Sequence, residues 1–162
     1  MASSEFLEAV RRRFGTRVPH NAALGLELLE LREDMALSRL PFGEHLVGNP
    51  VDGVLHGGVI TALMDATCGI AVRARLGTRI PIATLDLRID YLKPAPARCD
   101  VFARVECHHL TREVAFVRAS AFCVEDDPIA SAHGCFVVGT RRGEQTGYPW
   151  SEVPGPDDPG GM

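Results

Sequence analysis

The sequence contains no apolar run long enough to cross a membrane. A bilayer span needs about 20 consecutive, mostly apolar residues, and no segment of the 162-residue chain approaches that length. Its first residues, MASSEFLEAVRRRFGTR, also include no apolar stretch of signal-peptide length. We therefore expect a cytoplasmic protein that has no membrane partner.

An excess of charge of one sign is also missing. The formal net charge is −4 at pH 7, whereas proteins that bind nucleic acid usually carry a basic patch or a high isoelectric point. A hydrophobic content of 46% and a charged content of 23% are ordinary for a globular domain. Nucleic acid is therefore not an expected partner.

Motifs for metal binding and disulfide exchange are absent, although cysteine and histidine both occur. No two of the five cysteines form a Cys-x-x-Cys pair, and most lie in strand-like runs, where a thiol behaves as a small buried hydrophobe. The histidines have no metal-ligand spacing, since the adjacent His108 and His109 would point to opposite faces of a strand. We expect reduced thiols, no metal and no cofactor.

A chain of this length is long enough for one domain with a sizeable core, and short for two. We place that domain at residues 1–140. Residues 141–162 are rich in glycine and proline and have no hydrophobic periodicity, so we expect a flexible tail. Within this tail, Tyr148 and Trp150 could pin part of the chain to a partner subunit.

Two segments have helical patterns. In SSEFLEAVRRRF the apolar residues recur at helical spacing behind a serine cap, which predicts a short amphipathic helix. From about Gly57 to Arg75 nearly every residue is apolar, which is typical of a helix surrounded by protein. The longer helix is therefore the predicted centre of the core.

The rest of the domain has strand patterns. LGLELLELRE and MALSRLPF predict two strands, and residues 43–53 are predicted to form a loop. CDVFARVECHH and EVAFVRASAFCVE predict an antiparallel hairpin, and PIASAHGCFVVG a last strand. After Pro81, an alternation of period two predicts a strand whose apolar face carries Ala83, Leu85, Leu87, Ile89 and Tyr91. The predicted class is α+β, with five to six antiparallel strands around the long helix.

Asp65 is the only charged residue between Asp52 and Arg73, and the predicted helix places it among apolar neighbours. A buried carboxylate without a partner is strongly unfavourable, so hydrogen bonds, water or a substrate pocket should serve it. The structural alternatives are that Asp65 starts a second helix at DATC, or pairs with an arginine such as Arg88. Asp65 is our candidate catalytic carboxylate.

The motif His56-Gly57-Gly58 opens the same helix. Backbone N–H groups in the first turn of a helix have no intrahelical acceptor, and the helix dipole makes them electropositive. A glycine pair there lets a substrate oxygen approach these amides, which is how an oxyanion hole is built. Glycines at a helix start can also be simple turn residues. The presence of Asp65 two turns later favours the interpretation as an oxyanion hole.

Together these segments resemble a known family. NPVDGVLHGGVITALMDATCGIA, followed by TLDLRIDYLKPA and IASAHGCFVVG, is similar to the hotdog-fold acyl-CoA thioesterases of the PaaI (phenylacetic-acid-pathway) type. The similarity extends from about Leu24 to Gly139. It implies a hotdog fold, in which a curved antiparallel sheet wraps the long helix. It also implies a homodimer, expected to form a homotetramer as a dimer of dimers, whose site combines groups from opposite subunits.

The resemblance also implies roles for single residues. Asp65 matches the catalytic carboxylate, which acts as nucleophile or as general base on water. Gly57 matches the amide that polarises the thioester carbonyl, with His56 beside it. Asn49 matches a polar loop residue that holds the thioester or the water, and Thr84 matches a hydroxyl residue that orients the attacking water.

Some of these residues also have a structural explanation. Thr84 could be a β-branched residue on the solvent side of a strand, and Asn49 could be a turn former. We assign substrate binding to Gly58, Arg88 and Lys93, the last two as candidate contacts for the coenzyme A phosphates. Such charges are more often simply solvated.

The predicted reaction is hydrolysis of an acyl-CoA thioester to a free acid and coenzyme A, with the acyl group undetermined. A hotdog hydratase would carry a histidine where this chain has Ile70, so that alternative is disfavoured. A non-catalytic acyl-CoA-binding module is the other alternative, and the presence of Asp65 and the glycine pair argues against it. Cys68 has no histidine in the same helix to activate it, so we assign it to packing.

Overall fold

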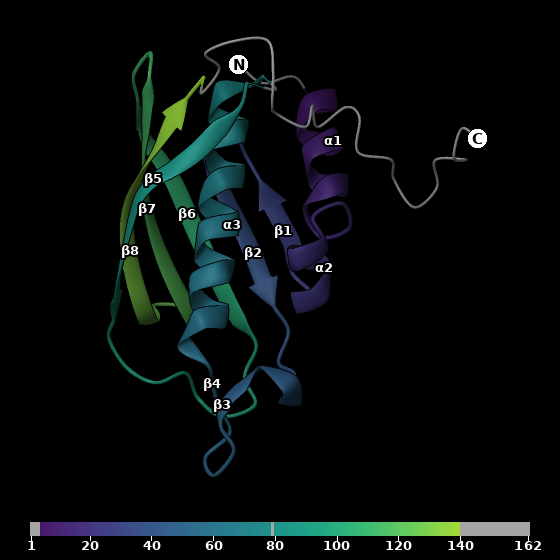
Figure 1. Cartoon of the computed structure of the whole chain (residues 1–162), viewed down its shortest axis with the longest axis vertical. Helices are drawn as coiled ribbons and strands as arrows, with labels where there is room; N and C mark the ends of the chain where they lie inside the picture. Colours follow the sequence, from purple (N-terminus) through teal and green to yellow (C-terminus); the bar gives the residue numbers. More distant parts are fainter. Residues whose placement is uncertain (1–3, 79, 140–162) are drawn as a thin grey trace, which may run out of the picture.

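The computed structural model describes residues 4–78 and 80–139. Within these residues a six-stranded antiparallel sheet curves around one long helix, α3 (Gly57–Leu76), as Figure 1 shows. The strand order is β1-β2-β6-β7-β8-β5. The strands are β1 (Glu27–Leu31), β2 (Met35–Leu40), β5 (Ile82–Tyr91), β6 (Val101–Leu110), β7 (Val114–Val124) and β8 (Asp127–Val138). The predicted class is confirmed.

Helix α3 is held by the side chains that face the sheet. Leu63, Met64, Cys68 and Ala71 have no exposed surface, and the helix packs mainly against β2, β6 and β7. These strands contribute small buried side chains to the core, including Ala36, Ala103, Ala115 and Ala121. Small side chains on the sheet let the helix approach closely. The apolar helix is therefore packed tightly at the centre of the core.

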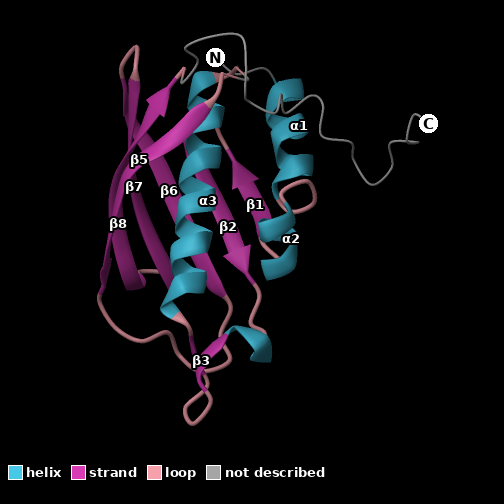
Figure 2. Cartoon of the chain, in the orientation of Figure 1, coloured by secondary structure: helices cyan, strands magenta, loops and turns pink. Residues whose placement is uncertain are grey.

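Two short helices lie beside α3 and β1, as Figure 2 shows. The first was predicted, and the second, six residues long, is too short to produce a recognisable period. The buried Asn21 donates from Nδ2 to the carbonyl of Phe14 at 3.0 Å. Arg11 donates to the carbonyl of Leu29 on β1. These hydrogen bonds connect the two helices to each other and to the sheet. The helices are α1 (Ser4–Phe14) and α2 (Pro19–Leu24).

The predicted loop at residues 43–53 contains a small hairpin. Asn49 Oδ1 accepts from the Val51 N–H at 3.1 Å, and Asn49 Nδ2 donates to Asp52 Oδ2 at 2.8 Å. The prediction of a loop was wrong where the 3-10 helix and the first strand of the hairpin form. Elements of only three residues show no recognisable periodicity in the sequence. The elements are η1 (Glu44–Leu46), a 3-10 helix, followed by β3 (Val47–Asn49) and its antiparallel partner β4 (Val54–Leu55).

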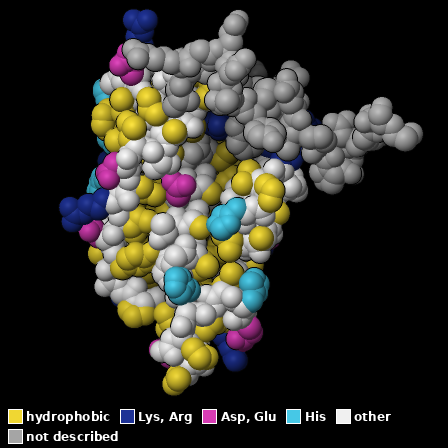
Figure 3. Space-filling model, in the orientation of Figure 1, with side chains coloured by type: hydrophobic (Ala, Val, Ile, Leu, Met, Phe, Trp, Pro, Cys, Tyr) yellow, Lys and Arg dark blue, Asp and Glu magenta, His cyan; other side chains and the backbone are white. Residues whose placement is uncertain are grey.

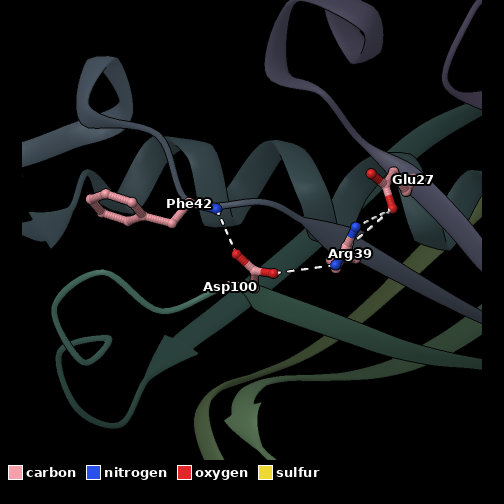
Figure 4. A network of polar contacts seen from close by, with 4 residues as sticks. All are labelled: Glu27, Arg39, Phe42 and Asp100. Carbon is pink, nitrogen blue, oxygen red and sulfur yellow. Dashed lines mark hydrogen bonds and ion pairs between the residues drawn. The ribbon is translucent and has the colours of Figure 1, made fainter.

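A polar network fixes the chain between the end of β2 and this hairpin (Figure 4). Arg39 pairs with Glu27 on β1 at 2.7 Å and with Asp100 at 3.4 Å. Asp100 also accepts from the backbone N–H of Phe42 at 2.8 Å. The network joins β1, β2 and the segment before β6, so it anchors the connection that leads to the start of α3.

Strand β5 contains a β-bulge that the sequence pattern does not reveal. Thr84 pairs with Phe136 and Asp86 with Cys135, so Leu85 has no partner on β8. The face of the strand changes at this point. Leu87 packs against the core, together with Ile82 and Ile89, whereas the side chain of Leu85 is 58% exposed. The predicted apolar face was therefore wrong in the first half of the strand.

Three other predictions concern membrane spans, metal sites and the C-terminal tail. No helix in the described part of the chain is long and apolar enough to span a membrane. Residues 4–78 and 80–139 contain no group of three or more histidine, cysteine or acidic side chains that could hold a metal ion. The tail at residues 141–162, with Tyr148 and Trp150, lies outside the described residues. The assignment of residues 1–140 to one domain stays a prediction.

Candidate active site

Asp65 lies near the middle of α3, on the side of the helix that faces α1 and β5. Its side chain is half-buried, and Oδ1 accepts a hydrogen bond from Thr84 Oγ1 at 3.0 Å. The ion pairs between described residues include none with Asp65, and Arg88 pairs with Asp90 at 3.0 Å. Helix α3 is also continuous from Gly57 to Leu76. The alternative of a second helix start at DATC is therefore wrong, and so is the pairing of Asp65 with Arg88.

Thr84 reaches Asp65 because of the bulge in β5. It lies before the unpaired Leu85, where even-numbered residues face the helix. Opposite the bulge, a Cβ atom at Gly134 would lie 2.7 Å from the carbonyl oxygen of Asp86, so glycine is required there. Thr84 is exposed to solvent, as the alternative expected, and its hydroxyl also donates to Asp65.

The start of α3 presents two hydrogen-bond donors. His56 is the N-cap residue, and its Nδ1 accepts from the Gly58 N–H at 3.0 Å. Because Nδ1 is an acceptor, the neutral ring carries its proton on Nε2. The Gly57 N–H occupies the first helical position and has no acceptor within the helix. The donors are therefore the amide of Gly57 and the Nε2–H of His56, while Gly58 is engaged in the cap.

Tyr91, at the far end of β5, holds the first turn of α3. Its hydroxyl donates to the Gly57 carbonyl at 2.7 Å and lies 2.7 Å from Thr61 Oγ1. Neither Tyr91 nor Thr61 was predicted from the sequence to belong to the site. A regular strand would place Tyr91 and Thr84, which are an odd number of residues apart, on opposite faces, so the signal becomes visible only once the bulge is known.

A pocket of about 430 Å³ opens beside Asp65. Figure 3 shows hydrophobic side chains gathered in the hollow between α3 and the N-terminal helices. A concave, largely apolar pocket with a few polar groups is typical of a small-molecule site. Its walls include Phe6, Val10 and Phe14 of α1, His20 and Asn21 of α2, Ala66, Gly69 and Ile70 of α3, Thr84 of β5 and Phe136 of β8.

Cys68 is not available for nucleophilic chemistry. Its side chain is fully buried, and burial raises the pKa of its thiol far above the ordinary value, with a further contribution from the negative charge of Asp65. A protonated thiol is a poor nucleophile. The assignment of Cys68 to packing is consistent with this environment.

Three other predicted residues have local partners of their own. Both polar atoms of the Asn49 side chain are engaged in the turn between β3 and β4. Arg88 is 76% exposed in its pair with Asp90, and Lys93 pairs with Asp127. The proposed substrate roles of Asn49, Arg88 and Lys93 stay predictions.

The sequence and the fold have counterparts in known proteins. Residues 52–130 match the model of a family described as the thioesterase superfamily. The medium/long-chain acyl-CoA thioesterase YigI of Escherichia coli K12 is 30% identical over 156 residues, which cover 86% of this chain and 97% of the relative. The chain therefore belongs to the thioesterase superfamily. The prediction that it is a thioester hydrolase is confirmed.

Solved structures lead to the same family. A crystal structure of a Pseudomonas aeruginosa protein is 41% identical and has a TM-score of 0.73, over 82% of this chain and 98% of that chain. A mutant of the phenylacetic acid degradation protein PaaI from Thermus thermophilus is 28% identical with a TM-score of 0.65, over 74% and 97%. The predicted resemblance to PaaI-like hotdog proteins is confirmed.

Proposed function

We propose that the protein is an acyl-CoA thioesterase, which hydrolyses its substrate to a free acid and coenzyme A. The observation that carries this proposal is the Asp65 carboxylate, which has no salt bridge to a described residue, accepts from Thr84 and borders an apolar pocket. The name of YigI, an acyl-CoA thioesterase, supports the coenzyme A ester as substrate.

The reacting groups divide the chemistry into two tasks. Asp65 either attacks the thioester carbon or removes a proton from the attacking water, and Thr84 holds the carboxylate through its hydroxyl. The Gly57 N–H and the Nε2–H of His56 stabilise the oxyanion that forms on the carbonyl oxygen. The thiolate of coenzyme A leaves readily, so these two tasks suffice.

One chain cannot bring these two sets of groups to one thioester. Gly57 and Asp65 are eight residues apart on the same helix, which separates them by about 12 Å along its axis. A donor must lie about 3 Å from the carbonyl oxygen, and the attacking group about 3 Å from the carbon. The site therefore requires the helix start of a second copy, so we propose a homodimer.

The free edge of β5 fits this assembly. Among the described strands, β5 ends the sheet and pairs only with β8, and it exposes Leu85 and Tyr91 at 58% and 49%. Hydrophobic side chains gather over it in Figure 3. An unpaired edge of ten residues is a ready template for another strand.

Two-fold pairing of β5 with its copy would complete the site. Thr84, which holds Asp65, and Tyr91, which holds the Gly57 turn, lie toward opposite ends of β5. In an antiparallel pair, Thr84 of one protomer lies near Tyr91 of the partner subunit. Asp65 then approaches the helix start of the other protomer. Association of two such dimers into a tetramer remains part of the proposal.

Coenzyme A would bind at the outer rim of this interface. We propose that Arg88 and Lys93 contact its phosphates and that Asn49 and Gly58 border the thioester. The ion pairs that Arg88 and Lys93 now make are exposed to solvent. Such pairs contribute little stability, so a phosphate can replace the carboxylate at small cost.

Release of free thiol from a panel of acyl-CoA esters tests the reaction. Asp65→Asn should lower kcat by about 10²–10⁴-fold, the usual contribution of a general base. Glu8→Gln removes one negative charge from an exposed position on α1 and should leave kcat unchanged. Equal turnover by wild type and Asp65→Asn would remove the proposed mechanism. Tight binding of acyl-CoA without any turnover would favour the non-catalytic module.

The oxyanion donor has its own test. Proline is accepted at the first position of a helix but has no N–H, so Gly57→Pro removes the donor and should lower kcat by about 10²–10³-fold. Gly57→Ala keeps the N–H, and its Cβ would lie 3.5 Å from the Tyr91 ring, an ordinary contact. This variant is the matched control, and it should stay close to wild type.

Mixing the two inactive variants tests the shared site. In a dimer of one Asp65→Asn chain and one Gly57→Pro chain, one of the two shared sites has both groups intact. Half of the dimers in a random mixture are of this kind, so activity should return to about a quarter of wild type. No recovery after subunit exchange, confirmed by mass measurement, would place both groups in one chain.

A further inference from the structure

The pocket beside Asp65 follows one stripe of α3. The α3 residues that line it recur at spacings of three and four, so they share one side of the helix. Asp65 lies toward one end of this stripe, and the other end is marked by Arg73, two turns further along. The residues of the stripe are Ala62, Asp65, Ala66, Gly69, Ile70 and Arg73.

Small side chains on this stripe create the space. Ala62, Ala66 and Gly69 project little from the helix, whereas the sheet-facing side of the same helix carries larger residues such as Leu63 and Met64. At Gly69, a Cβ atom would meet only one described atom within 4 Å, the Cε1 of Phe136 at 4.0 Å. The position therefore opens onto the pocket.

The opposite wall is formed by α1 and is firmly attached. Figure 1 shows α1 beside α3 and running in the opposite direction. A Cβ atom at Gly15, directly after α1, would lie 2.5 Å from the carbonyl oxygen of Leu26, so the chain is pressed against the start of β1. Together with the Asn21 and Arg11 hydrogen bonds, this contact makes α1 a fixed wall of the pocket.

The length of the stripe sets the size of its occupant. From Asp65 to Arg73 the helix rises by about 12 Å. An extended chain of single bonds advances about 1.2 Å per bond, one third of the span of an extended residue. The stripe therefore matches an extended chain of about ten carbons whose reacting end lies at Asp65.

The far end of the pocket disfavours longer chains. Arg73 is half-buried, and this burial lowers the pKa of its guanidinium. A methylene group placed against a charged guanidinium displaces its hydration and gains no hydrophobic contact. Each methylene accommodated before that point gains hydrophobic contact with the walls.

We infer that the pocket between α1 and α3 binds an unbranched acyl chain of about ten carbons, and that Gly69 is the residue that sets its depth. This inference rests on the proposed function, since it takes Asp65 as the position of the thioester. Position 69 is four residues beyond Asp65, about 6 Å along the helix. A side chain at this position would close the pocket beyond the fourth to sixth carbon.

A chain-length series tests the inference. For wild type, kcat/KM on straight-chain acyl-CoA esters should rise about fourfold per methylene up to ten carbons and then level off or fall. Gly69→Leu should keep the butyryl and hexanoyl rates and lower the decanoyl rate by about 10²-fold. Ala23→Leu adds the same kind of side chain at an exposed position of α2 outside the pocket, and should leave the whole profile unchanged.

A second variant and a second measurement keep the test decisive. Val10→Phe fills the same space from α1 and should shorten the accepted chain if Gly69→Leu does not fold. Calorimetric titration with decanoate measures the pocket without turnover, and affinity should fall in both filled variants. An unchanged chain-length profile and unchanged decanoate affinity in these variants would overturn the inference. Decanoate binding that depends on Gly69, without hydrolysis of any ester, would instead overturn the proposed function.

Discussion

The two sides of helix α3 are built from similar apolar residues but serve different ends. The side toward the sheet is completely packed, with Leu63, Met64 and Cys68 fully buried. The side toward α1 carries alanine, glycine and the half-buried Asp65, and a pocket remains there. The difference shows that one helix can supply both the centre of the core and the floor of a site, because side-chain size alone decides whether space remains.

Polar side chains on the two sides of α3 also differ in where their hydrogen-bond partners lie. On the packed side, the hydroxyl of Thr67 donates to the carbonyl of Leu63 at 2.6 Å within the same helix. On the open side, Asp65 receives its hydrogen bond from Thr84 on another element. Thr67 is satisfied within its own helix, whereas the partner of Asp65 lies on another element beside the pocket, which supports the role proposed for Asp65.

Truncation on the packed side should produce the largest change in stability. Leu63→Ala should lower the free energy of unfolding by about 2–5 kcal/mol, since it removes buried methyl groups and leaves a cavity. Turnover per folded molecule should hardly change. Asp65→Asn should show the reverse pattern, which urea denaturation and thiol release together would reveal. Loss of stability in Asp65→Asn equal to that of Leu63→Ala would erase the contrast between the sides.

The buried thiols of Cys68 and Cys107 should lower the free energy of unfolding at alkaline pH. Burial raises the pKa of Cys68 strongly and that of Cys107 to about 11, whereas an unfolded thiol has a pKa of about 8.5. Below that value both states are protonated and these thiols have no effect. Above it the unfolded state binds fewer protons, so the free energy of unfolding falls by up to about 1.4 kcal/mol per pH unit for each thiol.

Urea denaturation between pH 7 and 10 measures this slope. Cys68→Ala should make the decline above pH 9 shallower, whatever its effect on stability at pH 7. An identical slope in the variant would mean that the thiol of Cys68 ionises equally in both states. The same series would show that Cys68 does not behave as an activated nucleophile.

Removal of the Tyr91 hydroxyl should have a smaller effect on the open side. Tyr91→Phe deletes the hydrogen bond to the Gly57 carbonyl but keeps the ring. A net loss of about 0.5–1.5 kcal/mol is usual for one hydrogen bond, and the partial exposure of Tyr91 favours the lower end. Hydrogen exchange at the first turn of α3 should increase, and an unchanged exchange rate there would show that Tyr91 does not hold this turn.

The smallest expected change is a gain. Gly69→Ala should raise the free energy of unfolding by about 0.5–1 kcal/mol, because glycine is the weaker residue in a helix interior. The added Cβ meets only the Phe136 ring at 4.0 Å among the described atoms. Thermal denaturation would detect the gain. A loss of stability would mean that the pocket side is as tightly packed as the sheet side.

The core could be predicted from the sequence more readily than the site. Helix α3 is the longest mostly apolar segment with no turn inside it, so its position and its burial follow directly from the residues. The pocket could not be predicted, because its space arises where α1 and α3 meet, and these segments are distant in sequence. Asp65 and the glycine pair could be selected from the sequence as unusual residues, and their catalytic roles are proposals.

Other misses have local causes. Leu85 was placed on the wrong face because a bulge leaves no mark in an alternating pattern. Asn49 behaves as a turn former, using its side chain within the hairpin that was predicted as a loop. Tyr91 was taken as one of several apolar residues, and its contact with Gly57 depends on the shifted face of the second half of the strand.

The unpaired residue at Leu85 has a consequence for how this strand can vary. Counting from Thr84 to Tyr91 gives an odd step, and only the extra residue between them brings both onto the helix side. Loss of the extra residue would leave an even step in a regular strand, so both supports of α3 would still face the helix. Strand β5 can therefore differ by this one residue, gained or lost together with its bulge, without turning Thr84 or Tyr91 away from α3.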